Sequence, residues 1–456
     1  MSICNSNVTS GFIDLATYDE IEKYMYGGAS ATAYFVRQTR RSTWFTQVPV
    51  VLSKASGQPD FGAEWSVGIS RAGDYLLQTW LRLKTPEVVL EANLQDNNRI
   101  RWTRNLMHNL IRECCITFND LVAARFDNYH LDFWTAFTVP SGKRNGYNNM
   151  IGNFDDLTAP QTTLRSFVLN LPLPFFYGRD SGVALPTAAL PYNEMRINFQ
   201  FRNWNELLIV DTPAAAPGTN PSASPTLAQL ATGAPSLSSG DVAVWANYAI
   251  VSNDERKRMA CAPRDMLIEQ VQSSPRTTFN PASVSTSDIR FSHAIKVLFF
   301  AVRNTTISSQ WSNYTAASPV PTATVVEFFP PGAVDPIQNT SLIYENTNRL
   351  TMMGSDYFSL VNPYYHAPVI PLETGYHMYS YSLDFMCLDP MGSTNYGKLT
   401  NVSLSPTASA GAVSGALGDG AEDSGADFAQ TYELVVTAVN NNIIRVSGGA
   451  LGFPVL

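Results

Sequence analysis

Residues 163–201 read TLRSFVLNLPLPFFYGRDSGVALPTAALPYNEMRINFQF, and this stretch indicates a chain built from β-strands. Apolar and polar side chains alternate over residues 167–171 and again over residues 195–201, which is the two-residue period of a half-buried strand. Prolines punctuate the segment between them, and proline is confined to turns and sheet edges because it cannot donate to a strand ladder. The stretch therefore predicts two strands joined by a long corner.

The same two-residue period recurs on both sides of this stretch. The further predicted strands lie at residues 65–69, 75–83, 110–118, 242–251, 289–302, 322–329, 376–385 and 432–446. Charged residues make up only 15% of the 456 residues, aromatic residues make up 11%, and Gly and Pro number 28 each. This composition favours many antiparallel strands joined by turns and excludes a largely disordered chain.

Three short helices are expected among the strands. Thr17 followed by Glu20 forms the pattern of a capping box, in which each side chain caps the backbone of the other residue. Ser252 followed by Glu255 repeats the pattern, and Asp127 is positioned to cap a helix over residues 127–137. The helices are too few to change the fold class, which remains all-β.

Two low-complexity stretches interrupt the pattern. Residues 212–240 and 405–426 are rich in small residues, and such compositions bury too little apolar area to offset their ordering entropy. We expect both to be flexible surface loops. The predicted organisation is an N-terminal arm with a short helix (1–30), a first β-rich domain (31–258) and a second (259–456).

The charge balance argues against direct nucleic-acid binding. The formal net charge is −8, whereas phosphate neutralisation needs a concentrated basic surface. Arg40-Arg41 and Arg256-Lys257-Arg258 are the basic clusters, and such charges more often face water or a neighbouring subunit. Arginine supplies 23 of the 30 basic residues, which suggests extensive burial against protein partners; codon usage or family drift is the alternative.

The sequence also indicates where the protein is made. No run of about 18 apolar residues occurs, and the opening MSICNSNVTSGF lacks the basic and apolar regions of a secretory signal. The five cysteines are scattered, and Cys114 and Cys115 would point to opposite faces of one strand. We therefore expect synthesis in the cytoplasm and reduced thiols.

No catalytic, cofactor-binding or metal-binding residue is predicted. The five histidines are spread along the chain without a metal-ligand spacing, and no phosphate-binding or dinucleotide-binding glycine motif occurs; the histidines are His108, His130, His293, His366 and His377.

Two groups of residues leave a weaker alternative open. Asp155-Asp156 and the acidic residues within 419–427 could serve as paired carboxylates of a glycosidase or as calcium ligands, although solvated loops are the favoured interpretation. Trp134, Trp204 and Trp245 could stack on sugars, although aromatic residues in a β-rich protein usually fill the core.

A specific motif lies near the C-terminal end. Residues 390–397, PMGSTNYG, followed by Lys398 and Asn401, resemble the P-x-G-S-x-N-aromatic signature of the major capsid proteins of nucleocytoplasmic large DNA viruses. Residues 171–201, 252–272 and 355–371 resemble other landmarks of that family in the same order.

The resemblance covers nearly the whole chain. Residues 6–28 and 102–134 are most similar to the major capsid proteins of iridoviruses, the iridescent virus group.

The resemblance implies a tandem double jelly roll, which is two eight-stranded antiparallel β-sandwiches with short helices and long surface loops. It further implies a structural protein, not an enzyme, whose homotrimers form pseudo-hexagonal capsomers that tile an icosahedral shell around an internal membrane and a DNA genome. The expected partners are other copies of the chain and minor capsid proteins. The N-terminal arm is expected to lie near the internal membrane without inserting. The alternative is a jelly-roll carbohydrate-binding or host-attachment protein.

Overall fold

The computed structural model describes residues 3–212, 220–316, 335–418 and 428–453. The chain divides into two units, residues 1–44 and residues 45–456, and each is described by itself. Within the second unit we call residues 45–263 the first half and residues 264–453 the second half.

The N-terminal unit contains two helices, α1 (Ile3–Ala16) and α2 (Glu20–Met25). The prediction of a helix here is confirmed for α2, but its cap is Asp19, whose carboxylate accepts a hydrogen bond from the backbone N–H of Ile21 at 3.0 Å. The Thr17 hydroxyl instead donates to the backbone carbonyl of Asp14 at 2.6 Å. Helix α1 was not predicted, because its many Ser, Thr and Asn residues are poor helix formers.

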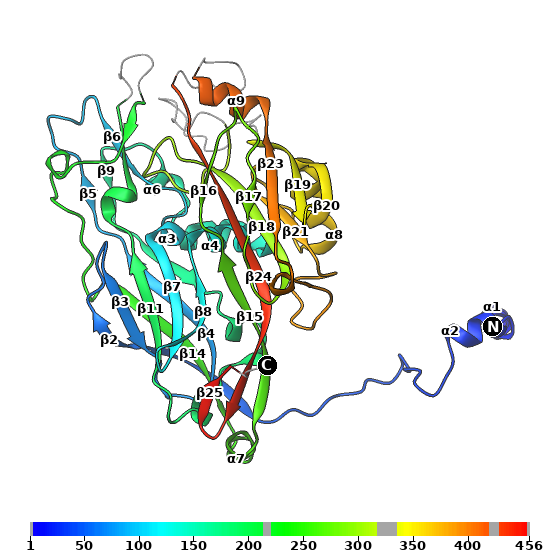
Figure 1. The fold of residues 1–456 in the computed structure, drawn as a ribbon. Helices are drawn as coiled ribbons and strands as arrows, with labels where there is room; N and C mark the ends of the chain where they lie inside the picture. The colour runs from blue at the N-terminus through cyan, green and yellow to red at the C-terminus, as the bar shows by residue number, and fades with distance from the viewer. Residues whose placement is uncertain (1–2, 213–219, 317–334, 419–427, 454–456) are drawn as a thin grey trace. The chain divides into compact units, whose positions relative to one another are not determined.

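Two antiparallel sheets form the body of the first half (Figure 1). One sheet has the order β1-β14-β4-β10, with bounds Phe45–Val51, Val242–Val251, Tyr75–Lys84 and Val168–Pro172. The other has the order β2-β3-β11-β7-β8, with bounds Ser53–Gly57, Glu64–Gly68, Met195–Phe201, Ile111–Phe118 and Leu121–Phe126. Their alternating apolar residues, such as Leu81 and Phe199, belong to one buried cluster.

Small sheets complete this half. They pair β13 (Ser222–Ala223) with β12 (Leu208–Asp211) and β6 (Arg99–Trp102), and β5 (Val88–Val89) with β9 (Thr163–Leu164).

The second half repeats the two-sheet arrangement. One sheet has the order β15-β24-β18-β21 (Arg264–Ser273, Tyr432–Ser447, Ala294–Asn304 and His377–Ser380), joined by β16 (Thr277–Phe279), β22 (Thr394–Asn395) and β25 (Ala450–Gly452). The other has the order β17-β23-β19-β20 (Ser287–Asp288, Val402–Ala408, Ile337–Tyr344 and Thr347–Gly354). Together the two halves have the sheet content of a double jelly roll.

Most predicted strands are confirmed, several of them with ends shifted by one residue, and two are interrupted or shortened. Leu110 ends helix α3 (Leu106–Leu110), so strand β7 begins one residue later than predicted. His293 has a φ of 63°, a left-handed conformation that breaks the predicted strand, and β18 therefore begins at Ala294. The predicted strand at 376–385 is limited to β21, and the one at 322–329 lies outside the described residues.

The low-complexity stretches contain more structure than predicted. In residues 212–240, Leu230 and Leu237 are buried, and Leu230 forms a β-bridge with Leu90. In residues 405–426, the first four residues belong to β23, and Ser409 then caps helix α9 (Ala410–Leu417) by accepting the Ala412 N–H at 3.3 Å. Apolar side chains and a local cap therefore order parts of both stretches.

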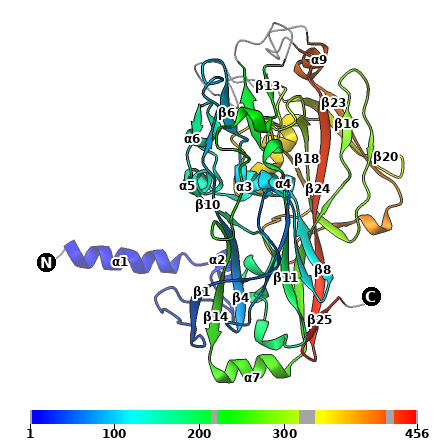
Figure 2. The ribbon, with the colours of Figure 1, turned by 90° about the vertical axis from the view of Figure 1, so that its left-hand side faces the viewer.

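Helices α3 and α4 (Asn128–Thr138) lie side by side near the middle of this unit, as Figures 1 and 2 show. The prediction that Asp127 caps the helix is confirmed, because its carboxylate accepts the His130 N–H at 2.9 Å. All residues of α4 from Asn128 to Phe137 are buried. Phe133 stacks on Phe299 of β18, so the largest apolar cluster runs through α4 from the first half into the second.

The remaining helices are short. They are α5 (Ser141–Ile151), α6 (Asp155–Thr158), α7 (Asn253–Cys261), α8 (Asn362–His366) and the single turns η1 (Phe176–Gly178), η2 (Ser181–Val183), η3 (Thr187–Ala189), η4 (Trp204–Glu206), η5 (Leu227–Gln229), η6 (Tyr357–Val361) and η7 (Tyr396–Lys398). Helix α7 begins after Ser252 as predicted, but the Ser252 side chain makes no capping hydrogen bond. Across the described ranges, no helix is both long and apolar enough to cross a bilayer.

Candidate functional site around Asp132

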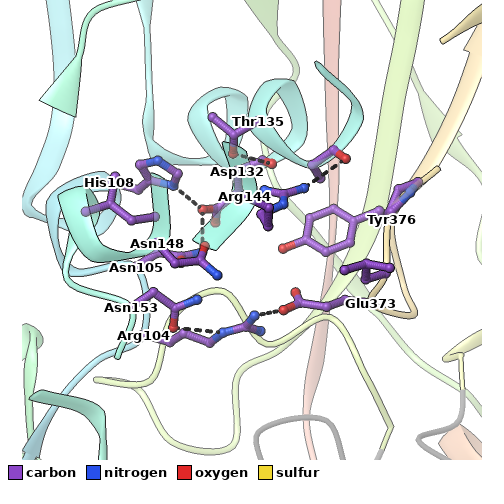
Figure 3. A pocket seen from close by; sticks show the side chains of 14 residues that line it. Arg104, Asn105, His108, Asp132, Thr135, Arg144, Asn148, Asn153, Glu373 and Tyr376 are labelled. Carbon is purple, nitrogen blue, oxygen red and sulfur yellow. Dashed lines mark hydrogen bonds and ion pairs between the residues drawn. The ribbon is translucent and has the colours of Figure 1, made fainter. Parts of the chain in front are cut away.

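A buried carboxylate on α4, that of Asp132, collects hydrogen bonds from both halves of the chain. Figure 3 shows the two partners from the first half, His108 and Asn105. Asp132 Oδ1 lies 2.7 Å from His108 Nδ1 and accepts a hydrogen bond from Asn105 Nδ2 at 3.2 Å. Asp132 Oδ2 accepts hydrogen bonds from the Ser312 hydroxyl at 2.7 Å and the Tyr314 hydroxyl at 2.9 Å. The first two partners belong to the first half and the last two to the second. The carboxylate is therefore fully satisfied and fastens the halves together.

His108 extends this network through its second ring nitrogen. Nε2 lies 2.6 Å from the Tyr147 hydroxyl, and the ring is completely buried. Burial raises the pKa of Tyr147 well above its usual value, so the hydroxyl stays protonated and is able to donate to Nε2 or accept from it. His108 donates from Nδ1 to the Asp132 carboxylate, so its ring joins Asp132 to Tyr147.

The His108–Asp132 pair resembles two members of a catalytic triad, but its surroundings do not supply the third. In a triad the free ring nitrogen takes a proton from a Ser or Cys nucleophile. Here that nitrogen is occupied by Tyr147, and the nearby Ser312 hydroxyl is bonded to Asp132. The geometry supports a structural network and gives no role in acyl transfer.

A small polar cavity of about 80 Å³ lies beside the network. Arg104 in its wall forms an ion pair with Glu373 of the second half, and burial lowers the pKa of Arg104 to about 10. Arg144 donates to the backbone carbonyl of Ala136 at 3.1 Å. A polar cavity of this size can hold several water molecules. Within the described ranges, no group of His, Cys, Asp and Glu side chains is arranged to hold a metal ion.

The hydrogen bonds continue from Ser312 along a chain of amides. Asn109 Nδ2 donates to the Ser312 hydroxyl at 2.9 Å, and Asn128 Nδ2 donates to Asn109 Oδ1 at 3.1 Å. Arg202 Nη2 donates to Asn128 Oδ1 at 2.9 Å. The buried amides thus connect Asp132 to an arginine at the end of β11.

The Trp311 ring lies between two guanidinium groups. The Cζ atoms of Arg202 and Arg303 lie 3.7 and 3.6 Å from the centre of the ring. The indole Nε1–H donates to the backbone carbonyl of Glu206 at 2.9 Å. Arg202 and Glu206 belong to the first half and the other two residues to the second, so this stack is a second fastening between them.

A third fastening is a buried ion-pair cluster. Lys296 Nζ lies 2.5 Å from Glu269 Oε1 and donates to the backbone carbonyl of Cys387 at 2.6 Å. Arg179 of the first half also pairs with Glu269, and its guanidinium lies 4.3 Å from the centre of the Trp134 ring. Buried charges of this kind are tolerated when paired and hydrogen-bonded.

The structure separates the histidines noted in the sequence. His108 belongs to the network, whereas His377 Nε2 lies 2.7 Å from Asp335 Oδ2. His130 is buried against Phe126 and Trp134, and burial, together with the charge of Arg179, lowers its pKa to about 3.

The other candidates are also dispersed. Trp134 packs edge-on against Phe385, and Trp245 stacks on Trp80 across neighbouring strands. Arg256 forms an ion pair with Asp74 at 2.8 Å within the chain.

The other residues considered in the sequence analysis are not brought together in one site within the described part of the chain. Asp155 and Asp156 occupy the exposed first turn of α6, Cys114 is buried while Cys115 is half-buried, and the acidic residues 419–427 lie outside the described residues.

The sequence did contain one usable signal for Asp132. It is the acidic residue in the middle of DNYHLDFWTAF, a helical segment rich in aromatic residues, and a carboxylate that such a helix buries needs donors. Nothing in the sequence predicts the roles of Ser312, Tyr314 and Trp311, because their hydrogen-bond partners lie far away in the sequence.

Comparison with known families gives two adjacent matches. Residues 33–251 match the model of the family "Major capsid protein N-terminus", and residues 255–452 match that of "Large eukaryotic DNA virus major capsid protein".

Major capsid proteins of several viruses align with the chain over its full length. The chain is 66% identical to the major capsid protein of Costelytra zealandica iridescent virus, 65% identical to that of Invertebrate iridescent virus 6, and 48% identical to that of Frog virus 3. Each alignment covers 100% of both proteins.

Solved structures show the same fold at low identity. The capsid protein in the quasi-atomic model of the PBCV-1 virus capsid superimposes with a TM-score of 0.72 at 21% identity, covering 93% of this chain and 100% of that one. The Faustovirus major capsid protein gives a TM-score of 0.69 at 10% identity, covering 94% of each chain. These neighbours are double jelly rolls, which confirms the predicted fold class.

Proposed function

Because this chain belongs to the major capsid proteins of large eukaryotic DNA viruses, and among them to those of the iridoviruses, we propose that it forms homotrimeric, pseudo-hexagonal capsomers that tile an icosahedral shell around an internal membrane and a DNA genome. The observation that carries this proposal is the 66% identity to an iridescent virus major capsid protein over the whole of both chains. Each relative and neighbour described above is a capsid protein, which gives no support to the carbohydrate-binding or host-attachment alternative.

The fold supplies the physical reason for a trimer. Three copies of a chain with two similar β-sandwiches place six sandwiches around a threefold axis, and the outline is then nearly hexagonal. We assign the sandwiches to residues 31–258 and 259–456, and the two family models, which meet between residues 251 and 255, support this division.

A group of exposed apolar side chains on the second half supports contact between copies. It surrounds η6 and α8, where Leu360, Val361, Tyr364 and Tyr365 are 51%, 42%, 70% and 72% exposed. Leu383, whose backbone carbonyl lies 3.0 Å from a ring nitrogen of His366 at the end of α8, is 70% exposed. Contiguous apolar surface of this kind marks protein–protein contacts, in which tyrosine is enriched.

Sedimentation tests whether the protein forms a trimer and whether the exposed apolar group around η6 and α8 forms the contact between copies. The purified protein at micromolar concentration should sediment as a trimer of the 50.1 kDa chain and appear hexagonal by electron microscopy. Tyr364→Ser with Tyr365→Ser should weaken the trimer, whereas Tyr192→Ser, at another exposed tyrosine, should not. A stable wild-type monomer would refute the trimer, and an unchanged double variant would move the contact to another face.

Further parts of the function are proposed from charge and composition. The net charge of −8 supports a protein that encloses the genome without binding it directly. Residues 1–28 carry Asp14, Asp19, Glu20 and Glu22 against Lys23, which favours a protein partner, such as a minor capsid protein, near the internal membrane over insertion into anionic lipid.

We further propose that the chain has no enzymatic activity. We also place synthesis and shell assembly in the host cytoplasm, with the mature protein in the virion. The occupied ring nitrogens of His108 support the first of these proposals.

A further inference from the structure

Arg202 is a buried cation without a carboxylate partner among the described residues. The residue is 7% exposed, and its Nη2 donates to the neutral amide oxygen of Asn128. Its Nε is buried and has no hydrogen-bond acceptor within the described part of the chain. Removing a guanidinium from water without pairing it is unfavourable, so the surroundings of Arg202 call for a compensating negative charge.

Arg202 lines a pocket of about 680 Å³ that lies where the two halves meet. Arg112 and Arg276 also line it, and their side chains are 54% and 51% exposed, so solvent reaches the pocket beside them. Ser224 and Ser308 add hydroxyl groups to the wall. The lining therefore combines three guanidinium groups and neutral hydrogen-bond donors with the two carboxylates of Asp127 and Glu206.

The nearby carboxylates each have a partner, and two of them pair with guanidinium groups that line the pocket. Glu206 lies 3.4 Å from Arg112. Glu433 lies 2.9 Å from Arg303 and 3.5 Å from Arg276. Asp127 caps α4 and accepts from the Ser273 hydroxyl at 3.2 Å. Among the described residues the lining holds three guanidinium groups and two carboxylates, and the adjoining pair of Arg303 and Glu433 adds one of each, which leaves a net positive charge.

The backbone adds a further contribution of the same sign. Helix α4 has eleven residues, and its first residues, Asn128 and Tyr129, line the pocket. The amino end of a helix carries a partial positive charge that favours anions. Guanidinium groups bind tetrahedral oxyanions in a planar, two-pronged geometry.

We propose that this pocket binds a phosphate-type oxyanion, held by Arg112, Arg202 and Arg276. Arg112 and Arg202 belong to the first half and Arg276 to the second, so the bound anion joins the two halves. A ligand that binds the folded chain and not the unfolded chain raises its stability in proportion to the logarithm of ligand concentration. The bound anion therefore stabilises the folded protein, and this stabilisation increases or decreases with the concentration of the free anion in solution.

The test measures phosphate binding to the purified full-length protein in chloride buffer at constant ionic strength. Inorganic phosphate should give a saturable calorimetric titration with one site per chain, and at about 100 times the dissociation constant it should raise Tm by a few degrees. Arg112→Gln, an exposed side chain whose loss leaves the core intact, should weaken the dissociation constant about tenfold. Arg202→Met should abolish binding if it folds.

Arg445→Gln is the matched control. It also removes one positive charge, from an exposed pair with Asp265 on β15, and it should bind phosphate like the wild type. The proposal is overturned if phosphate does not bind to the wild type, or if Arg112→Gln and Arg445→Gln bind it equally well. Because Arg112→Gln decides the outcome, a folding failure of Arg202→Met does not leave the question open.

Discussion

The carboxylate of Asp132 accepts a hydrogen bond of 2.7 Å from the hydroxyl of Ser312, which lies 180 residues further along the chain. The two residues belong to different halves, and both are almost completely buried. A hydrogen bond to a buried charged group contributes more to stability than one between neutral groups. The relationship predicts that the two β-rich halves unfold together.

We expect Asp132→Asn to lower the free energy of unfolding by about 2–4 kcal/mol, because an amide cannot accept from all four donors and removes a buried charge that they stabilise. Unfolding in guanidinium chloride measures the change. Asp156→Asn, on the exposed first turn of α6, is the control and should have no effect. An Asp132→Asn protein as stable as the wild type would contradict the role assigned to the network.

Trp311→Ala should lower the free energy of unfolding by about 3–5 kcal/mol. The substitution removes a buried ring on which Arg202 and Arg303 both stack, and the hydrogen bond to Glu206 is lost with it. Calorimetry should show one transition for the wild type and two separate transitions, one for each half, in the variant. Trp44→Ala, at a tryptophan that is 86% exposed, should leave a single transition at the wild-type temperature.

Acid should destabilise the chain through His130. Its pKa is lowered from 6.5 to about 3 in the folded chain, so between these values the unfolded chain binds a proton that the folded chain does not. The stability is complete above pH 6.5 and is lost as pH falls towards 3, by up to about 1.4 kcal/mol per pH unit.

His130→Phe should flatten this part of the profile, because phenylalanine keeps the contacts with Phe126 and Trp134 but does not titrate. The exposed His293 provides the matched variant, His293→Gln, whose profile should follow the wild type. Equal slopes for His130→Phe and the wild type between pH 6.5 and 3 would assign the acid sensitivity to other groups.

Deleting residues 1–28 should leave trimers intact and impair shell assembly. Residues 1–44 form a unit of their own, and its helices expose apolar side chains such as Phe12 and Ile21, which need a partner outside the unit. Sedimentation measures the trimer, and electron microscopy of assembly reactions measures the shells. Normal shells from the shortened chain would refute the proposed role of the arm.

The strands were largely predictable because each depends on a local period. Residues 242–251 and 195–201 match β14 and β11 residue for residue. The start of β18 was not predictable, because the positive φ of His293 has no signature in the sequence. The hydrogen-bond network of Asp132 could not be predicted for a different reason. The sequence contains an acidic residue in the middle of α4, but the packing of the two halves determines which donors surround it.

The burial of α4 has a consequence for synthesis. The apolar side chains of α4 are fully packed only when Phe133 contacts Phe299 and Tyr314. Those two residues leave the ribosome more than 160 residues after Phe133. At roughly 5–20 residues per second this delay is about 10–40 s. During that time the aromatic side chains of α4 that pack against the second half stay uncovered, and we expect the nascent chain to need host chaperones until translation reaches that half.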